Sequence, residues 1–110
     1  MNSAPEPGPF LQVDRLLHEP ARLLILSILA GAEAVEFRFV EQFSGLSKGN
    51  LSSHMSKLEA AGLIEISKAF RGKHPVTTLR MTPQGRQSLS AYRAQLETLV
   101  SSIPQSLPGT

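Results

Sequence analysis

The 110-residue sequence contains no cysteine and no tryptophan, has only one tyrosine, and has no long apolar run. Without cysteine the chain has no disulfide, no thiolate metal site and no thiol redox switch. The lack of an apolar run of about 18 residues excludes a membrane-spanning helix. The N-terminus also lacks the basic patch and apolar stretch of a secretory signal. We therefore expect a cytoplasmic protein without a membrane partner.

Histidine is scarce too, and its placement bears on catalysis. His18, His54 and His74 are the only histidines, so without cysteine we expect no metal site. Ser52, Ser53 and His54 are adjacent in sequence, but neighbours on a helix diverge by about 100° and cannot form a catalytic relay. The stretch GLSKG lacks the GxxxxGK[ST] spacing of a phosphate-binding loop. The sequence thus predicts a protein that is not an enzyme and needs no cofactor.

Acidic and basic residues are segregated along the chain. Residues 1–44 hold three arginines and six acidic residues, a balance of −3. Residues 45–90 hold seven lysines and arginines and two glutamates, a balance of +5. Such a basic segment is typical of a surface that binds a polyanion, although a merely solvated basic surface would give the same count.

Turn-forming residues divide the chain into one domain with two loose ends. Three prolines in the first nine residues predict a disordered lead-in over 1–10, and 104–110 is expected to be a flexible tail. The elements expected between them are a short helix at 10–19, an apolar helix from 20 to about 31, a short strand at 35–39, a short helix at 39–45 with Val40 and Phe43 facing inward, a helix at 47–61, strands at 63–70 and 76–82, and a long helix at 83–103.

The helix expected at 47–61 has clear start and stop signals. Ser47 is a good N-cap because its hydroxyl can accept a bond from an orphan backbone N–H. Gly62 suits the left-handed position after the helix, and Leu63 then follows at the place where a Schellman motif makes its hydrophobic contact. On a wheel of about 100° per residue, one apolar stripe faces inward. The residues of this stripe are Leu51, Met55 and Leu58.

The opposite side of the same helix combines small and hydrogen-bonding side chains with one lysine and has no carboxylate. Asn, Ser and Lys can bond base edges or phosphates, and a helix N-terminus attracts anions. The alternative is that these residues only cap and start the helix, which we favour for Ser52. We favour DNA contact for Ser53 and Lys57, while His54 is left open between DNA and a bond within the domain.

The loop RGKHP at 71–75 is expected to join the two strands, and all its charge is positive. It is longer than a tight hairpin turn. Arginine favours narrow minor grooves, and any cation there adds salt-dependent affinity for the DNA backbone. The same charge could simply keep a surface loop soluble.

The last helix is expected to begin with Thr82 as N-cap and Pro83 at the first helical position. Its apolar residues are spaced 3, 4, 3 and 4 apart, a heptad rhythm that can pack on another helix. The stripe could cover its own domain, but other segments already supply a core. We therefore expect it to pack against a second copy of the chain. The residues expected at this dimer surface are Leu11, Leu16, Leu17, Leu89, Tyr92, Leu96, Leu99, Val100 and Ile103.

LSKGNLSSHMSKLEAAGLIEI, followed by RGKHPVTTLRMTPQGRQSL, resembles the winged-helix transcriptional regulators of the MarR/ArsR kind. The small winged-helix DNA-binding domain subgroup is especially similar, with EFRFV before the turn and LTxxGR-like residues after the wing. The resemblance implies an α+β, mainly α fold over 11–103: a winged helix-turn-helix with a two-stranded wing and a long C-terminal dimerisation helix (83–103). It also implies a homodimer that binds double-stranded DNA. The recognition helix (47–61) would read the major groove, and the wing (67–77) would touch the flanking minor groove or backbone.

The residues expected at DNA are Ser47, Lys48, Gly49, Asn50, Ser53, His54, Lys57, Lys68, Arg71, Lys73 and His74. The sequence departs from metal-sensing ArsR proteins in having no cysteine pair, and from full MarR proteins in lacking their longer terminal helices. The usual ligand pocket, and hence any small-molecule effector, is left open. The alternative function is a winged helix that contacts proteins without binding specific DNA. RNA is a weaker fit, because the sequence offers few aromatic platforms for stacking bases.

Overall fold

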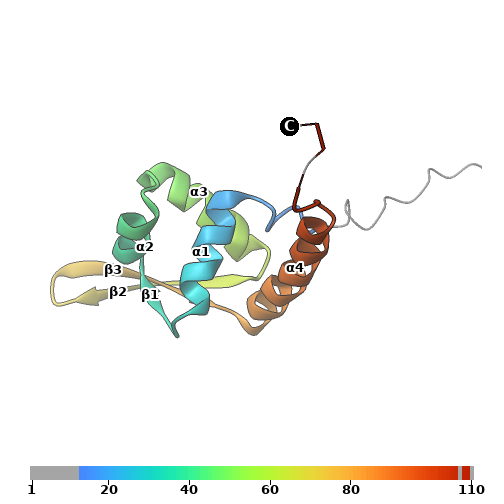
Figure 1. The fold of residues 1–110 in the computed structure, drawn as a ribbon. Coiled ribbons are helices and arrows are strands. Elements are labelled where there is room, and N and C mark those ends of the chain that lie inside the picture. Colours follow the sequence, from blue (N-terminus) through green and yellow to red (C-terminus); the bar gives the residue numbers. More distant parts are fainter. Residues whose placement is uncertain (1–12, 107, 110) are drawn as a thin grey trace, which may run out of the picture.

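The computed structural model describes residues 13–106, 108 and 109. Its sheet is antiparallel with the strand order β1-β3-β2. Figure 1 shows the β2–β3 hairpin reaching beyond the helices on the side away from the last helix. The elements are α1 (Pro20–Ala30), β1 (Val35–Glu36), α2 (Phe37–Ser44), α3 (Lys48–Ala60), β2 (Ile64–Arg71), β3 (His74–Met81) and α4 (Pro83–Ser101). The expected α+β, mainly α winged helix-turn-helix is thus confirmed.

The core lies between α1, α3 and the base of the hairpin. The apolar stripe expected on α3 is buried, and α1 contributes Ile25, Leu26 and Leu29. At the hairpin base, Ile64 and Leu79 are buried, whereas the residues toward the tip are exposed. The hairpin therefore continues past the edge of the core, and the side chains at its tip stay exposed.

The predicted start and stop of α3 are confirmed. The Ser47 hydroxyl accepts the Asn50 backbone N–H at 3.2 Å. At the other end, Gly62 takes a left-handed φ of 78°. The backbone N–H of Leu63 donates to the carbonyl of Leu58 at 3.0 Å, which is the long hydrogen bond of a Schellman motif.

The connection between β2 and β3 is a two-residue turn, so the expectation of a five-residue loop at 71–75 is wrong. The strand pairing continues to Arg71 and His74. Gly72 has a φ of 65°, and no non-glycine residue in the described part has a positive φ, a combination that fits a type II′ turn. Pro75 is tolerated because the pair next to the closing pair of such a hairpin is non-hydrogen-bonded, so its missing N–H breaks no bond to β2.

Two expected elements before the hairpin also differ. The strand expected at 35–39 is only two residues long, and the helix that follows begins at Phe37, not Phe39. The helix expected at 10–19 is replaced over its described part by turns, because the Asp14 carboxylate accepts the backbone N–H groups of Leu16 and Leu17. Asp often draws the backbone into such local bonds in place of a helix.

Phe43 was expected to face inward, and this is wrong: it is 65% exposed. With the helix starting at Phe37, Val40 is the buried residue of α2, and Phe39 and Phe43 share the outer face one turn apart. Their rings stack on each other with centroids 5.8 Å apart.

The expected loose ends fall largely beyond the regular structure. The lead-in predicted for 1–10 lies outside the described residues, and α4 ends at Ser101, two residues before the expected 103. In the part of the chain that the structure describes, no helix has the length and apolar character needed to cross a bilayer.

Candidate nucleic-acid interface

The N-terminal part of α3 is bare on its outer side. Lys48, Gly49, Asn50, Ser53 and Lys57 are all exposed, and no acidic residue lies between Ser47 and Lys57 in the sequence. The core stripe on the other side fixes the rotation of the helix, so this face cannot turn inward. Such a face suits the approach of a polyanion, because it presents donors and a cation without a repelling carboxylate.

Three of the expected DNA residues on this helix differ in their surroundings. Ser47 is exposed but already caps the helix through its hydroxyl. Around Gly49, an added Cβ would meet nothing within 4 Å of the described structure, so its own fold does not require a glycine. Lys48 lines a cleft that also reaches the hairpin. The helix start is therefore held by a cap and is otherwise open.

His54 points back toward α1, and of its two possible roles the bond within the domain is the one observed. Its Nδ1 lies 3.3 Å from Nη1 of Arg22 and 3.7 Å from Oε2 of Glu19, and its side chain is only 20% exposed. This contact holds His54 on the side of α3 that faces α1, apart from the exposed outer face. Burial by itself would raise the pKa of Glu19, but hydrogen bonds from the backbone N–H groups of Arg22 and Ala21 and the charges of His54 and Arg22 hold it below its ordinary value.

The cations expected on the wing are all exposed, but Arg71 is not free. Lys68, Lys73 and His74 lie on the outer part of the hairpin. Nη2 of Arg71 forms an ion pair with Oε1 of Glu36, from the strand before α2. Sequence reasoning placed Arg71 in an open loop and so missed this partner.

A cleft of about 480 Å³ separates the hairpin from the helix-turn-helix. Its charged and titratable lining residues are Glu36, Arg38, Lys48, Arg71 and His74. Glu36 and Arg38 were not expected at the interface. Glu36 and Arg38 line the cleft because α2 begins at Phe37. The alternation in VEFRF had predicted a longer strand over these residues instead.

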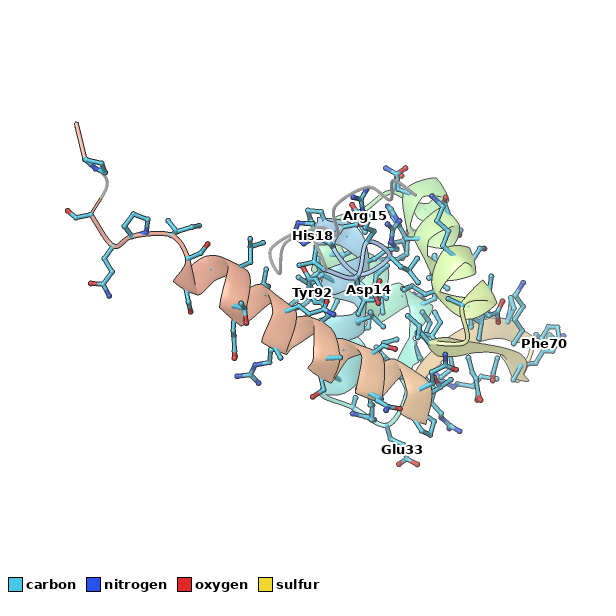
Figure 2. All side chains as sticks on the ribbon, turned by 90° about the vertical axis from the view of Figure 1, so that its right-hand side faces the viewer. Asp14, Arg15, His18, Glu33, Phe70 and Tyr92 are labelled. Atoms are coloured by element: carbon cyan, nitrogen blue, oxygen red, sulfur yellow. The ribbon has the colours of Figure 1, made fainter. Side chains whose placement is uncertain are left out.

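Exposed aromatic side chains were also missed. Phe39 is 52% exposed beside Phe43, and Phe70 is 76% exposed. Figure 2 shows Phe70 at the far end of the hairpin.

The residues expected at a dimer surface divide into two groups. Leu17 and Tyr92 are 0% and 3% exposed, so they belong to the core of their own chain, and their assignment to a partner surface is wrong. The Tyr92 hydroxyl is 2.8 Å from Nδ1 of His18, a pair visible in Figure 2. Burial raises the pKa of Tyr92, and the charge of Asp14 raises it further.

The other expected dimer residues differ in exposure, and Leu16, Leu89 and Leu96 pack against the core of their own chain. Figure 2 shows the C-terminal half of this helix projecting away from the domain. Val100 and Ile103 are 55% and 59% exposed. Leu11 lies outside the described residues, while the remaining members of the set, Leu16, Leu89, Leu96 and Leu99, are half-buried.

Over residues 13–106, 108 and 109, no group of three or more His, Asp or Glu side chains is placed to hold a metal ion. Every buried side-chain nitrogen or oxygen in that part has a hydrogen-bond partner. The polar groups with unused bonding capacity are therefore on the surface, and the outer side of α3 and the hairpin carry many of them.

Comparison with known proteins agrees with this geometry. An uncharacterized protein of Methanocaldococcus jannaschii is 29% identical over 89 residues, which cover 81% of this chain and 97% of that protein. A transcriptional regulator homologue from Pyrococcus horikoshii OT3 superposes with a TM-score of 0.77 at 25% identity, over 84% of this chain and 91% of the other. A MarR-family regulator from Silicibacter pomeroyi has the same fold, with a TM-score of 0.60 at 18% identity over 84% and 61% of the two chains. The family model described as winged helix DNA-binding domain matches residues 21–100. Because that match spans most of the chain, the protein belongs to the winged helix DNA-binding domain family.

Proposed function

We propose that the protein is a sequence-specific regulator of transcription that binds double-stranded DNA as a homodimer and acts as a repressor. In this proposal α3 enters the major groove, and the hairpin lies on the flanking minor groove or backbone. The observation that carries it is the bare, acid-free outer side of α3, whose first residue, Lys48, shares a cleft with the hairpin residues Arg71 and His74.

The roles of the side chains follow from their chemistry. Asn50, Ser53 and Lys57 can bond base edges, while Gly49 allows the helix backbone to approach closely. Lys68, Lys73 and Arg71 on the hairpin supply positive charge for phosphates, which positions the domain without reading sequence. Specificity is thus assigned to α3 and general affinity to the wing.

The dimer part of the proposal rests on α4. Val100 near its end is exposed, as is Ile103 just after the helix, and Leu96 and Leu99 are half-buried. A second copy of this helix would cover these side chains. A two-fold dimer would then present two recognition helices to half-sites about 10 base pairs apart, or a multiple of that. Sedimentation at micromolar concentration tests it, and a monomer there would refute the dimer.

The experiment that tests DNA recognition is selection of bound duplexes from a random pool, followed by a salt titration on the selected site and on a scrambled duplex. We expect an enriched motif with two-fold symmetry and an affinity that falls steeply as salt rises. No enrichment together with salt-independent binding would reject the proposal. Repression is tested by placing the selected site in a reporter promoter, where the protein should lower expression.

The alternative of a protein-contact module has one observation in its favour, the stacked and exposed pair Phe39 and Phe43 on α2. An exposed aromatic pair of this kind can mark a protein interface. The alternative predicts that Phe39→Ser and Phe43→Ser leave DNA affinity unchanged but abolish binding to a protein partner. If the chain selects no duplex at all, this reading replaces DNA recognition.

A further inference from the structure

The cleft between the hairpin and the helix-turn-helix contains the ion pair between Glu36 and Arg71. This pair has no part in the proposed recognition of DNA by α3. Glu36 stands at the N-cap of α2, yet within the described structure its side chain makes no cap hydrogen bond. It reaches Arg71 instead, 35 residues further along the chain, at the end of β2. The pair therefore links the start of the helix-turn-helix to the outer part of the wing.

The lining of the cleft includes the uncharged residues Phe37, Pro75, Val76 and Thr77, and its permanent charges are mostly positive. Arg38, Lys48 and Arg71 are permanent cations, and Glu36 is the only carboxylate in the lining. Its volume of about 480 Å³ greatly exceeds the roughly 30 Å³ that one water occupies in the liquid. There is room for a phosphate group with its hydration in a cleft whose lining includes three permanent cations.

We propose that this cleft receives one backbone phosphate of the bound DNA, and that Glu36 takes the place of that phosphate on Arg71 in the free protein. The proposal rests on the proposed DNA-binding function and adds a competitor to it. On binding, Arg71 exchanges the carboxylate for the phosphate, while Arg38 and Lys48 face the same group. Every duplex must first break the pair between Glu36 and Arg71, so Glu36 opposes binding to all duplexes alike, and it does so through Arg71.

The exchange is feasible because the ion pair is open to water. The Arg71 side chain is 73% exposed and that of Glu36 is 39% exposed. A pair this open stabilises an equilibrium by about fivefold at most. A guanidinium binds phosphate with the same two-pronged geometry as carboxylate, and a phosphate contact also releases counterions from the DNA. The phosphate therefore outcompetes the carboxylate, and Glu36 weakens binding without preventing it.

The test is a double-mutant cycle measured by DNA affinity. Glu36→Gln should raise affinity about two- to fivefold on both the selected site and a scrambled duplex, because it frees Arg71. Arg71→Gln should lower affinity on both. In the Arg71→Gln background, Glu36→Gln should give no gain, because its effect acts through Arg71. Glu65→Gln, which removes an exposed carboxylate of β2 that does not line the cleft, is the matched control and should have little effect.

Equal gains from Glu36→Gln with and without Arg71 would overturn the proposal, since a general field effect adds in both backgrounds. The absence of any gain would overturn it as well.

Duplexes with one methylphosphonate, moved along the site, give a second measurement. At one position the neutral group should weaken DNA binding by the wild type but not by Arg71→Gln. If no position behaves in this way, the result contradicts the proposal. Thermal melting confirms that each variant is folded. If the wild type binds no duplex, the proposed function fails; if it binds and the cycle is additive, only the exchange fails.

Discussion

α3 and α4 begin in the same way but in different surroundings. Each is capped by a hydroxyl: Ser47 accepts the Asn50 N–H at 3.2 Å, and Thr82 accepts the Gly85 N–H at 2.9 Å. Each also has a glycine in its first turn. A Cβ on Gly85 would lie 2.1 Å from the carbonyl oxygen of Leu63, whereas a Cβ on Gly49 would meet nothing within 4 Å of the described residues. The same residue type is thus required by internal packing in one helix and by nothing internal in the other.

The comparison explains an oddity of the chain. Glycine weakens a helix by roughly 0.5–1 kcal/mol relative to alanine, and Gly85 offsets this cost by letting α4 sit directly on the strand region. Gly49 gains nothing of the kind from its own fold. A surface that admits a partner backbone, as in the proposed function, would give a reason for this glycine.

The largest effect is expected from Gly85→Ala. The added methyl group would overlap backbone, which cannot move aside as a side chain can, so α4 must shift off the hairpin base. We expect a loss of about 3 kcal/mol in the free energy of unfolding, at the upper end for overpacking. Thermal melting should show a fall in Tm of more than about 10 °C. An unchanged Tm would mean that the two helix starts do not differ as described.

The second-largest effect on stability is expected from removing the helix caps, and it should differ between the two helices. The Thr82 hydroxyl donates to the Gly62 carbonyl at 2.6 Å in addition to accepting the Gly85 N–H. Ser47 is exposed, and within the described residues its hydroxyl makes only the cap bond. Thr82→Ala should therefore lower the free energy of unfolding by about 2 kcal/mol and Ser47→Ala by about 1 kcal/mol or less. Urea denaturation of both variants decides this, and equal losses would contradict it.

The sequence predicted these helix starts well because caps, glycine stops and apolar stripes are local signals. The bounds of α3, its Schellman motif and its buried stripe all follow from residues within one or two turns of each other. The Glu36–Arg71 pair could not be found this way, because it depends on how far the hairpin pairing extends and on where α2 begins. The exposure of Phe43 was missed for the same reason: starting α2 two residues earlier turns a different face to the core.

Smaller effects are expected on DNA binding from the bare face of α3. Lys57→Ala and Ser53→Ala should each weaken binding to the selected site by about 1 kcal/mol while leaving a scrambled duplex nearly unchanged. Arg71→Ala should weaken both duplexes evenly and reduce the slope of affinity against salt by about 1. Fluorescence anisotropy at several salt concentrations measures both quantities. Identical losses from the α3 and wing variants on every duplex would remove the division of roles between them.

Gly49→Ala is expected to have the smallest effect and gives the sharpest form of the comparison with Gly85→Ala. Because nothing in the described fold contacts the new methyl group, the free energy of unfolding should rise by about 0.5 kcal/mol. Affinity for the selected site should fall, and the salt dependence should stay unchanged because no charge is altered. Ser52→Ala is the control on the same helix, expected to leave affinity unaltered. If Gly49→Ala stabilises the protein and binding is equal to that of the wild type, then no partner approaches this helix start, and α3 is bare for some other reason.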